Sequence, residues 1–349
     1  MGTDYYVQRN NKNLETIERL LENDLPTFCY DYFLAIDSQT STLTRLNYAH
    51  DLKIFFYFLS EKRFQGKSVK DFTLEDLSQV TSTDIEYFLG FLSHYNYCGK
   101  QHNCNDRAKA RKLSSVRAMF KYFFNKGFIS VDNSAKVATP KIHEKPIIRL
   151  DGNEIFSIID IAESGNGLTR HQLAYHEKNK VRDSAILMLF LGTGIRISEL
   201  VGLNNDDLNF NDNSFIVTRK GGNKTILYFD DDVASALQRY IEYKDQTIDI
   251  TGDTNALFIS NNQNRITVRA VENLVNKYAK IVSPLKKISP HKLRSTYGTA
   301  LYKATGDIYI VADVLGHKDV NTTRKHYAAI SDDNRRAVAG KVKLKRDDD

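Results

Sequence analysis

The sequence predicts a mainly α-helical protein of two lobes with one small β-sheet. Apolar residues recur at three-and-four spacing through most of residues 25–138, which is the period of an amphipathic helix. A proline-containing stretch at 139–148 interrupts this pattern, and a hairpin pattern follows in the part beyond it. At 349 residues, of which 41% are hydrophobic, the chain is long enough for two separate cores.

The first lobe is expected to be a four-helix domain over 25–138. Each candidate helix has Ser, Thr or Asp near its start, where a side-chain oxygen can accept a backbone N–H. The four segments are 27–35, 42–59, 83–94 and 106–125. Residues 1–24 are polar apart from a short apolar run, so we expect an N-terminal extension with an accessory helix.

The helix over 106–125 combines an apolar stripe with a basic face. Leu113, Val116, Phe120 and Phe123 form the stripe, and residues 107–126 hold seven basic residues and no acidic one. A solvated charged face usually mixes signs, so a face of one sign favours contact with nucleic-acid phosphates. The basic residues expected to contact DNA are Arg107, Lys109, Arg111, Lys112, Arg117 and Lys121.

Composition excludes several other classes of protein. No apolar run approaches a membrane span, and the N-terminus lacks the layout of a signal peptide, so we expect a cytoplasmic protein. The net charge of +6 does not by itself identify a nucleic-acid binder. His94, Cys98, His102 and Cys104 fit no common zinc spacing, so we interpret them as a polar loop with reduced thiols and expect no metal.

Residues 139–148 are expected to form a linker to a second domain over 149–349. This stretch holds two of the five prolines of the chain, and proline biases its neighbours towards extended backbone. The second domain mixes helical patterns with a hairpin, and a third strand is expected at 256–260. Two lobes joined by a linker can close around a long, rod-shaped ligand.

Two basic residues of the second domain lie at turns. Arg196 follows a Gly-Thr-Gly break between two apolar helices, where an arginine is held in position rather than mobile on a solvated helix face. Strand patterns at 214–218 and 225–229 flank a Gly-Gly-Asn turn and predict a hairpin, with Lys220 at its mouth.

Residues 288–327 gather further reactive side chains. Ser289 and Pro290 signal the start of a helix, on which His291 and Arg294 point the same way. Because a helix N-terminus favours an anion, we expect a phosphate there.

A second helix, over 308–315, is expected to end at Gly316 with His317 at the bend, and a polar helix beyond it carries Tyr327. One arginine, two histidines and a tyrosine suggest oxyanion binding with a hydroxyl nucleophile, although each alone is more often structural. Tyr297, Tyr302 and Tyr309 are rival tyrosines on the two preceding helices.

Five motifs in this order resemble those of the tyrosine site-specific recombinases, the group of Xer proteins, phage integrases and transposon integrases. They are GTGIRISEL around Arg196, RKGGNK around Lys220, SPHKLRSTYGTAL around His291 and Arg294, LGHKDVNTT around His317, and HYA around Tyr327. The resemblance covers about residues 26–330. The ten residues from His317 to Tyr327 are one more than we expect for most relatives.

The resemblance implies an α+β catalytic domain and a SAM-like, helical core-binding domain that clamps one side of a duplex. The helix over 42–59, with Thr44 and Arg45, and the helix over 106–125 would then lie near the major groove. The implied catalytic residues are Arg196, Lys220, His291, Arg294 and His317, with Tyr327 as nucleophile.

The implied reaction passes through a 3′-phosphotyrosine link and needs no cofactor, metal or ATP. The implied partners are double-stranded recombination sites, three further copies in a homotetramer whose C-terminal tails dock in trans, and an accessory DNA-bending or activating protein. Such a protein would be associated with the nucleoid. A type IB topoisomerase and a non-catalytic DNA-binding protein remain alternatives, as do chromosome-dimer resolution and movement of a mobile element.

Overall fold

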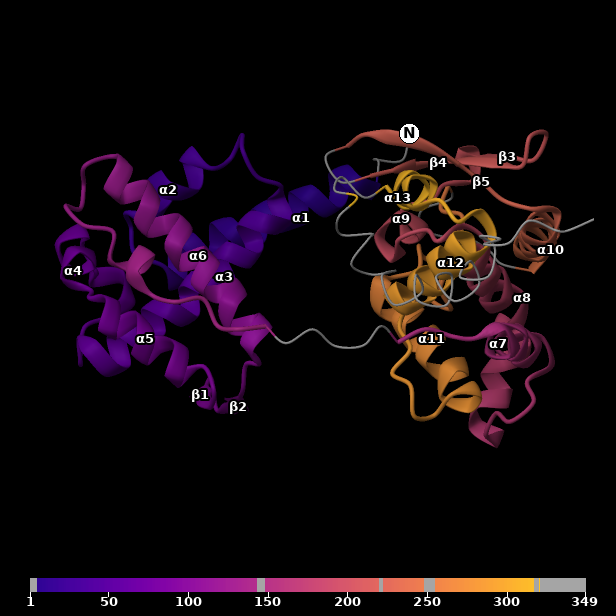
Figure 1. The fold of residues 1–349 in the computed structure, drawn as a ribbon, viewed down its shortest axis with the longest axis horizontal. Helices are drawn as coiled ribbons and strands as arrows, with labels where there is room; N and C mark the ends of the chain where they lie inside the picture. Colours follow the sequence, from indigo (N-terminus) through magenta and orange to yellow (C-terminus); the bar gives the residue numbers. More distant parts are fainter. Residues whose placement is uncertain (1–4, 143–147, 220–221, 248–254, 317–319, 321–349) are drawn as a thin grey trace, which may run out of the picture. The chain divides into compact units, whose positions relative to one another are not determined.

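The chain divides into two compact units, Thr3–Lys145 and Pro146–Asp349 (Figure 1). The computed structural model describes residues 5–142, 148–219, 222–247, 255–316 and 320. Both units are mainly helical, which confirms the predicted mainly α-helical fold class. Each unit contains a small antiparallel sheet, whereas the sequence predicted a sheet in the second unit alone. Across the described ranges, none of the helices combines the length and the hydropathy that crossing a bilayer requires.

The first unit is built from helices and one short hairpin. Its helices are α1 (Tyr5–Asp24), α2 (Cys29–Ala35), α3 (Thr42–Phe58), α4 (Leu74–Gln79), α5 (Ser82–Phe91) and α6 (Asp106–Asn125). Helix α4 is additional to the four helices expected over 25–138. The hairpin pairs β1 (Tyr95–Tyr97) with β2 (Lys100–His102). A π-helical turn, Leu59–Arg63, extends α3.

Side-chain caps explain where several of these helices begin. Ser41 accepts a backbone N–H at the start of α3, and Asn105 does so at the start of α6. Thr73 and Asp76 form a reciprocal capping box at the start of α4. Such caps satisfy N–H groups that have no acceptor within the helix.

The core of the first unit packs α6 against α3. The four residues of the predicted apolar stripe are at most 1% exposed, and the ring of Phe120 lies 6.3 Å from that of Phe55 on α3. Helix α1 packs against α3 as well, and Ile17, Leu20 and Leu21 are buried in the same cluster. The described part of the expected N-terminal extension is thus part of this core, because its apolar face has α3 to cover it.

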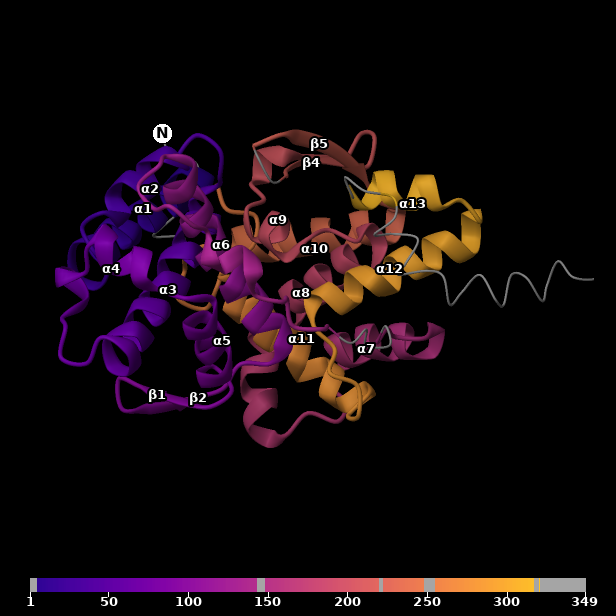
Figure 2. The same cartoon turned by 60° about the vertical axis from the view of Figure 1, so that its left-hand side comes forward.

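The second unit surrounds α8 with other helices (Figures 1 and 2). Its helices are α7 (Gly152–Ser164), α8 (Arg170–Thr193), α9 (Ile197–Val201), α10 (Asp231–Thr247), α11 (Val268–Val282), α12 (Pro290–Thr305) and α13 (Ile308–Leu315). The α8 helix packs against α7, α10 and α12. An antiparallel sheet in the order β3 (Leu208–Asn209), β4 (Ser214–Thr218), β5 (Lys224–Tyr228) contains the predicted hairpin.

Two short segments differ from the sequence expectation. The polar loop expected around Cys98 is the β1–β2 hairpin, with Cys98 in its turn at φ 49°. The strand expected at 256–260 is wrong, because this segment makes only isolated bridges, through Ala256 and Ile259. Its apolar side chains are buried, with Phe258 stacked on Tyr240 of α10, and a short buried run looks like a strand in sequence.

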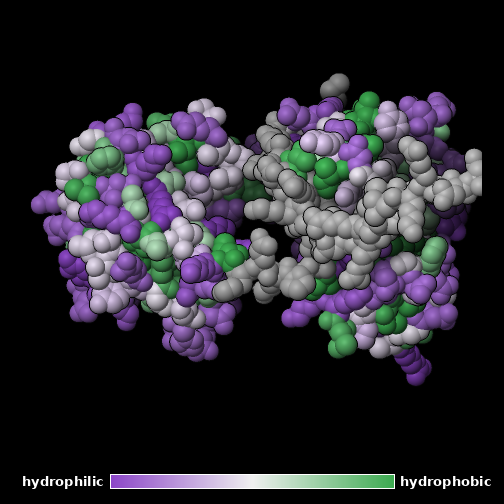
Figure 3. All heavy atoms as spheres, in the orientation of Figure 1, coloured by the Kyte–Doolittle hydropathy of each residue, from purple (hydrophilic) through white to green (hydrophobic). Residues whose placement is uncertain are grey.

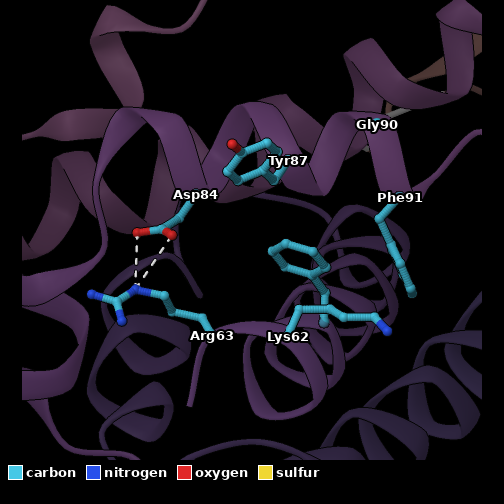
Figure 4. Close-up of a pocket in the computed structure, with 7 residues that line it drawn as sticks. Lys62, Arg63, Asp84, Tyr87, Gly90 and Phe91 are labelled. Atoms are coloured by element: carbon cyan, nitrogen blue, oxygen red, sulfur yellow. Dashed lines mark hydrogen bonds and ion pairs between the residues drawn. The ribbon is translucent and has the colours of Figure 1, made fainter. Parts of the chain in front are cut away.

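The visible face of the first unit carries mainly hydrophilic residues with small apolar patches between them (Figure 3). A cavity of about 430 Å³ lies between the end of α3 and α5, lined by Phe58, Tyr87 and Phe91 (Figure 4). Arg63 and Asp84 form an ion pair of 3.3 Å on its wall. All of its lining residues belong to the first unit, whereas the candidate catalytic residues belong to the second.

Candidate active site

Arg196 is fixed at the turn between α8 and α9. Gly194 ends α8 at φ 64°, and a Cβ on it would overlap the ring of Tyr297, so the close approach requires glycine. Arg196 then occupies the N-cap position of α9, where its backbone N–H donates to Oε2 of Glu199 at 2.9 Å. Its Nη1 donates to Oε1 of the same buried carboxylate at 2.7 Å. Directly after the glycine turn, Glu199 therefore holds both the main chain and the guanidinium of Arg196.

Arg294 lies in the first turns of α12 and is 5% exposed. Its Nη1 donates to the carbonyl of Gly194, and its Nη2 donates to the carbonyl of Leu315 at the end of α13. Nη2 of Arg196 also donates to the Leu315 carbonyl, at 3.1 Å, and to the Gly316 carbonyl, at 2.8 Å. Two guanidiniums that are 98 residues apart (294 − 196) thus meet at one carbonyl oxygen.

His291 lies one helical turn before Arg294 and is exposed. The helix begins at Pro290, as predicted, but the Ser289 hydroxyl makes no side-chain cap. Instead, the carbonyl of Ser289 accepts the backbone N–H of Lys292 at 2.7 Å. The predicted side-chain cap is therefore wrong, but the predicted helix start is right. Proline at the first position already sets the backbone angle that the helix needs.

A third arginine, which sequence reasoning did not single out, also reaches the end of α13. Nη2 of Arg219 donates to the Val314 carbonyl at 3.0 Å. Burial lowers the pKa of Arg219, the Glu199 carboxylate opposes that effect, and the charge of Arg196 adds to it. Arg219 directly precedes Lys220 in the RKGGNK motif, but a basic residue at a turn is too common for its position alone to have identified this contact.

The carboxyl end of α13 explains why the arginines gather there. The last carbonyls of a helix have no N–H partner within it and carry partial negative charge. Gly316, in the left-handed conformation at φ 58°, ends α13 as the sequence predicted. Lys220, His317 and Tyr327 lie outside the described residues; His317 follows Gly316 in the sequence.

The rival tyrosines are on the helices where they were expected. Tyr297 and Tyr302 lie on α12, and Tyr309 lies on α13 with 70% of its surface exposed. Burial raises the pKa of Tyr297, and the charge of Asp230 raises it further. The Tyr297 phenolate is therefore harder to form than that of an exposed tyrosine.

The basic face of α6 carries a buried counter-charge from another helix. Asp51 of α3 is fully buried and accepts from both Nη atoms of Arg111, at 2.5 and 2.8 Å, and from Lys112 at 2.9 Å. The Ser115 hydroxyl donates to the same carboxylate at 2.9 Å. With α3 in place, α6 is no longer a face of a single sign, because an acidic residue 60 positions from Arg111 neutralises part of it.

The other residues expected to contact DNA differ in how far the protein already engages them. Arg45 is buried and paired with Asp37, and Arg117 donates to the carbonyls of Ser134 and Val137. Lys109 donates to the Ser93 hydroxyl at 2.6 Å. The remaining members of the set are Thr44, whose N–H donates to Ser41, and the exposed Arg107 and Lys121.

Comparison with known proteins identifies the family. Residues 149–334, more than half of the chain, match the phage integrase family. The tyrosine recombinase XerC of Syntrophus aciditrophicus is 31% identical over 309 residues, which cover 86% of this chain and 92% of the relative. The tyrosine recombinase XerS of Streptococcus agalactiae is 28% identical over 354 residues, with coverage of 93% and 98%.

Solved structures agree in fold. The XerH recombinase bound to its palindromic difH substrate superposes with a TM-score of 0.64 at 16% identity, covering 86% of this chain and 80% of that one. The Tn1549 transposon integrase in complex with a circular-intermediate DNA gives 0.63 at 20% identity, covering 90% and 99%. The chain therefore belongs to the phage integrase family of tyrosine recombinases. Members of this family cut and rejoin DNA at specific sites, and that is the activity of this protein.

Proposed function

We propose that this recombinase exchanges DNA strands through a covalent link between Tyr327 and a 3′-phosphate. The observation that supports it best is the meeting of Arg196 and Arg294 at the Leu315 carbonyl, on a chain that carries all five recombinase motifs. Planar guanidiniums that converge on one oxygen can bind the two non-bridging oxygens of a phosphodiester with paired hydrogen bonds. They thereby stabilise the charge that develops during cleavage.

The remaining catalytic roles follow from the chemistry that each step needs. The phenolic oxygen of Tyr327 attacks phosphorus, with His291 accepting or relaying its proton, and His317 adds a hydrogen bond to a non-bridging oxygen. The bond from phosphorus to the 5′-oxygen breaks, and Lys220 gives that oxygen a proton. A 5′-hydroxyl of another duplex reverses the step, so strand exchange through a Holliday junction needs no ATP and no divalent ion.

DNA capture is assigned to the helical unit over 25–138, joined by the 139–148 segment to the catalytic unit over 149–349. Exposed basic residues such as Arg107 and Lys121 are suited to contact phosphates, since each such contact releases counterions from the duplex. The substrate is a pair of double-stranded recombination sites in the nucleoid. The outcome is either resolution of chromosome dimers or movement of a mobile element, with an accessory DNA-bending or activating protein as a further partner.

A nicked suicide substrate tests the catalytic proposal. The nick lets the strand beyond the cleavage site diffuse away, so the wild-type protein accumulates as a covalent adduct that withstands denaturation. Tyr327→Phe should bind the site and yield no adduct, whereas Tyr309→Phe, which alters an exposed tyrosine on α13, should yield as much as wild type. An adduct on Tyr327→Phe would overturn the nucleophile assignment.

The assembly on DNA is proposed to be a homotetramer in which the C-terminal tail of each protomer docks on its neighbour. Removing residues 331–349 should then reduce higher-order complexes on paired sites and leave binding to one site intact. Native gel electrophoresis with one-site and two-site DNA measures both. Wild-type levels of paired complex in the truncated protein would argue against docking in trans.

A further inference from the structure

We propose that Arg219 is a positioning residue that ties the turn of the β4–β5 hairpin to the carboxyl end of α13. It would thereby hold the residue after it, Lys220, in register with the phosphate-binding arginines. This inference rests on the proposed function, in which Lys220 protonates the leaving 5′-oxygen. Three observations on described residues carry it.

The first observation is that the main chain of Arg219 closes the hairpin turn. Its N–H donates to the carbonyl of Asn223 at 2.8 Å, and its own carbonyl accepts the N–H of Gly222 at 3.0 Å. The strand pairing Thr218 with Lys224 leads directly into this turn. Because consecutive Cα atoms are about 3.8 Å apart, an anchor at Arg219 limits where the next residue can lie.

The second observation is that the side chain of Arg219 is seated on the end of α13. Nη2 donates to the Val314 carbonyl, and the guanidinium lies so close to Gly316 that a Cβ on this residue would overlap it. Gly316 is therefore required twice, once for its left-handed backbone and once to leave room for Arg219.

The third observation is that Arg196 and Arg294 bind the same helix end, at the next carbonyls along. Arg219 shares that anchor with both of them, so a shift of the hairpin relative to α13 would also be a shift relative to the phosphate site. Its Nε is buried and has no acceptor among the described residues, so this placement carries a desolvation cost. The Val314 contact and the packing on Gly316 are what hold it there.

The leaving group provides the test. Arg219→Ala should cleave a normal phosphodiester roughly 10²-fold more slowly than wild type, which is the typical effect of a small displacement of a reacting group. A substrate with sulfur in place of the 5′-bridging oxygen needs no acid, because a thiolate leaves unprotonated. If Arg219 positions the acid, the same variant should cleave the sulfur substrate at close to the wild-type rate, as Lys220→Ala should.

Matched variants separate this role from general damage. Arg269→Ala removes an exposed arginine from α11 of the same unit and should leave both rates unchanged. Arg219→Lys keeps the charge but not the planar fork, so it should restore only part of the loss on the oxygen substrate. An equal defect of Arg219→Ala on both substrates, or no defect on either, would overturn the inference.

A second route covers the case in which Arg219→Ala does not fold. Arg219→Met keeps the length of the side chain and its packing on α13 but removes the donor to the Val314 carbonyl, and it leaves Gly316 and its contact with Arg196 unchanged. Loss of cleavage on the oxygen substrate with recovery on the sulfur substrate supports the inference, and equal loss on both overturns it. Failure of the wild-type protein to form any adduct would instead refute the proposed function, so the two failures are distinguishable.

Discussion

The two units of this recombinase hold their basic side chains in different ways. In the helical unit, Arg111 and Lys112 share the buried carboxylate of Asp51, whereas in the catalytic unit Arg219 and Arg294 donate to backbone carbonyls. A carboxylate orients a guanidinium and also cancels its charge, but a carbonyl dipole orients it and leaves the charge in place. The comparison teaches that a buried carboxylate neutralises the basic residues of one unit, whereas backbone carbonyls hold those of the other with their charge available for the anion binding proposed above.

Arg196 combines both arrangements. Its Nη1 and backbone N–H are held by the Glu199 carboxylate, while its Nη2 donates to the carbonyls of Leu315 and Gly316. The Glu199 carboxylate fixes Nη1 of Arg196. Nη2 of Arg196 donates to the Leu315 carbonyl, which also accepts from Arg294. Asp51 holds both Arg111 and Lys112, so a DNA phosphate would have to compete with this carboxylate for either side chain.

The largest effect is expected from removing an arginine that donates to backbone carbonyls in the catalytic unit. Arg294→Ala should slow single-turnover cleavage by roughly 10²–10³-fold, the usual result of removing one preorganised donor from a developing oxyanion. Binding of the duplex should change much less, because many other phosphate contacts remain. Quenched-flow cleavage and gel-shift titrations on the same DNA measure the two quantities. Equal losses in binding and cleavage would place Arg294 with the DNA-capture residues.

Removing Asp51, the carboxylate that holds Arg111 and Lys112, should lower the stability of the fold before it affects function. Asp51→Ala leaves two cations next to a buried site, and loss of one partner of a buried ion pair costs about 3 kcal/mol. The cost should fall at the lower end of the usual range, because the Arg111 side chain is 50% exposed and can turn to water. Urea unfolding followed by circular dichroism measures it. Glu86→Gln, at an exposed position on α5, is the control and should change stability by less than about 0.5 kcal/mol.

The smallest effect is expected from substitutions that compare two lysines of α6. Lys121 is exposed and Lys112 is 8% exposed and paired with Asp51. Lys121→Ala should weaken binding equally for all sequences and reduce the slope of log affinity against log salt by about 1. Lys112→Met should leave that slope unchanged and lower stability. A reduced slope in Lys112→Met would mean that the carboxylate-held lysine reaches phosphate after all.

The sequence predicted the elements of this fold better than the contacts between them. The apolar stripe of α6, the start of α12 at Pro290 and the end of α13 at Gly316 depend on residues a few positions apart, and their spacing records them. The strand at 256–260 failed because a short buried run has no period that distinguishes it.

Contacts between residues that are far apart in the sequence produce no such local spacing. Asp51 neutralises Arg111 from 60 positions away, and Arg219 reaches Val314 across 95, so neither pairing is visible in local spacing. The catalytic set could be predicted only because family motifs mark its members. Their motifs alone support the roles of Lys220, His317 and Tyr327, and those roles remain predictions.

The end of α13 has a consequence for which molecules can occupy the site at all. If a phosphate binds Arg196 and Arg294 as proposed, it competes with main-chain oxygens for their N–H groups, because these groups already donate to the end of α13. A small free anion brings no other contact to offset that exchange and should be a poor inhibitor. A duplex bound along its length brings many such contacts, so under this proposal the same internal bonds would favour a phosphodiester that arrives with the rest of the DNA.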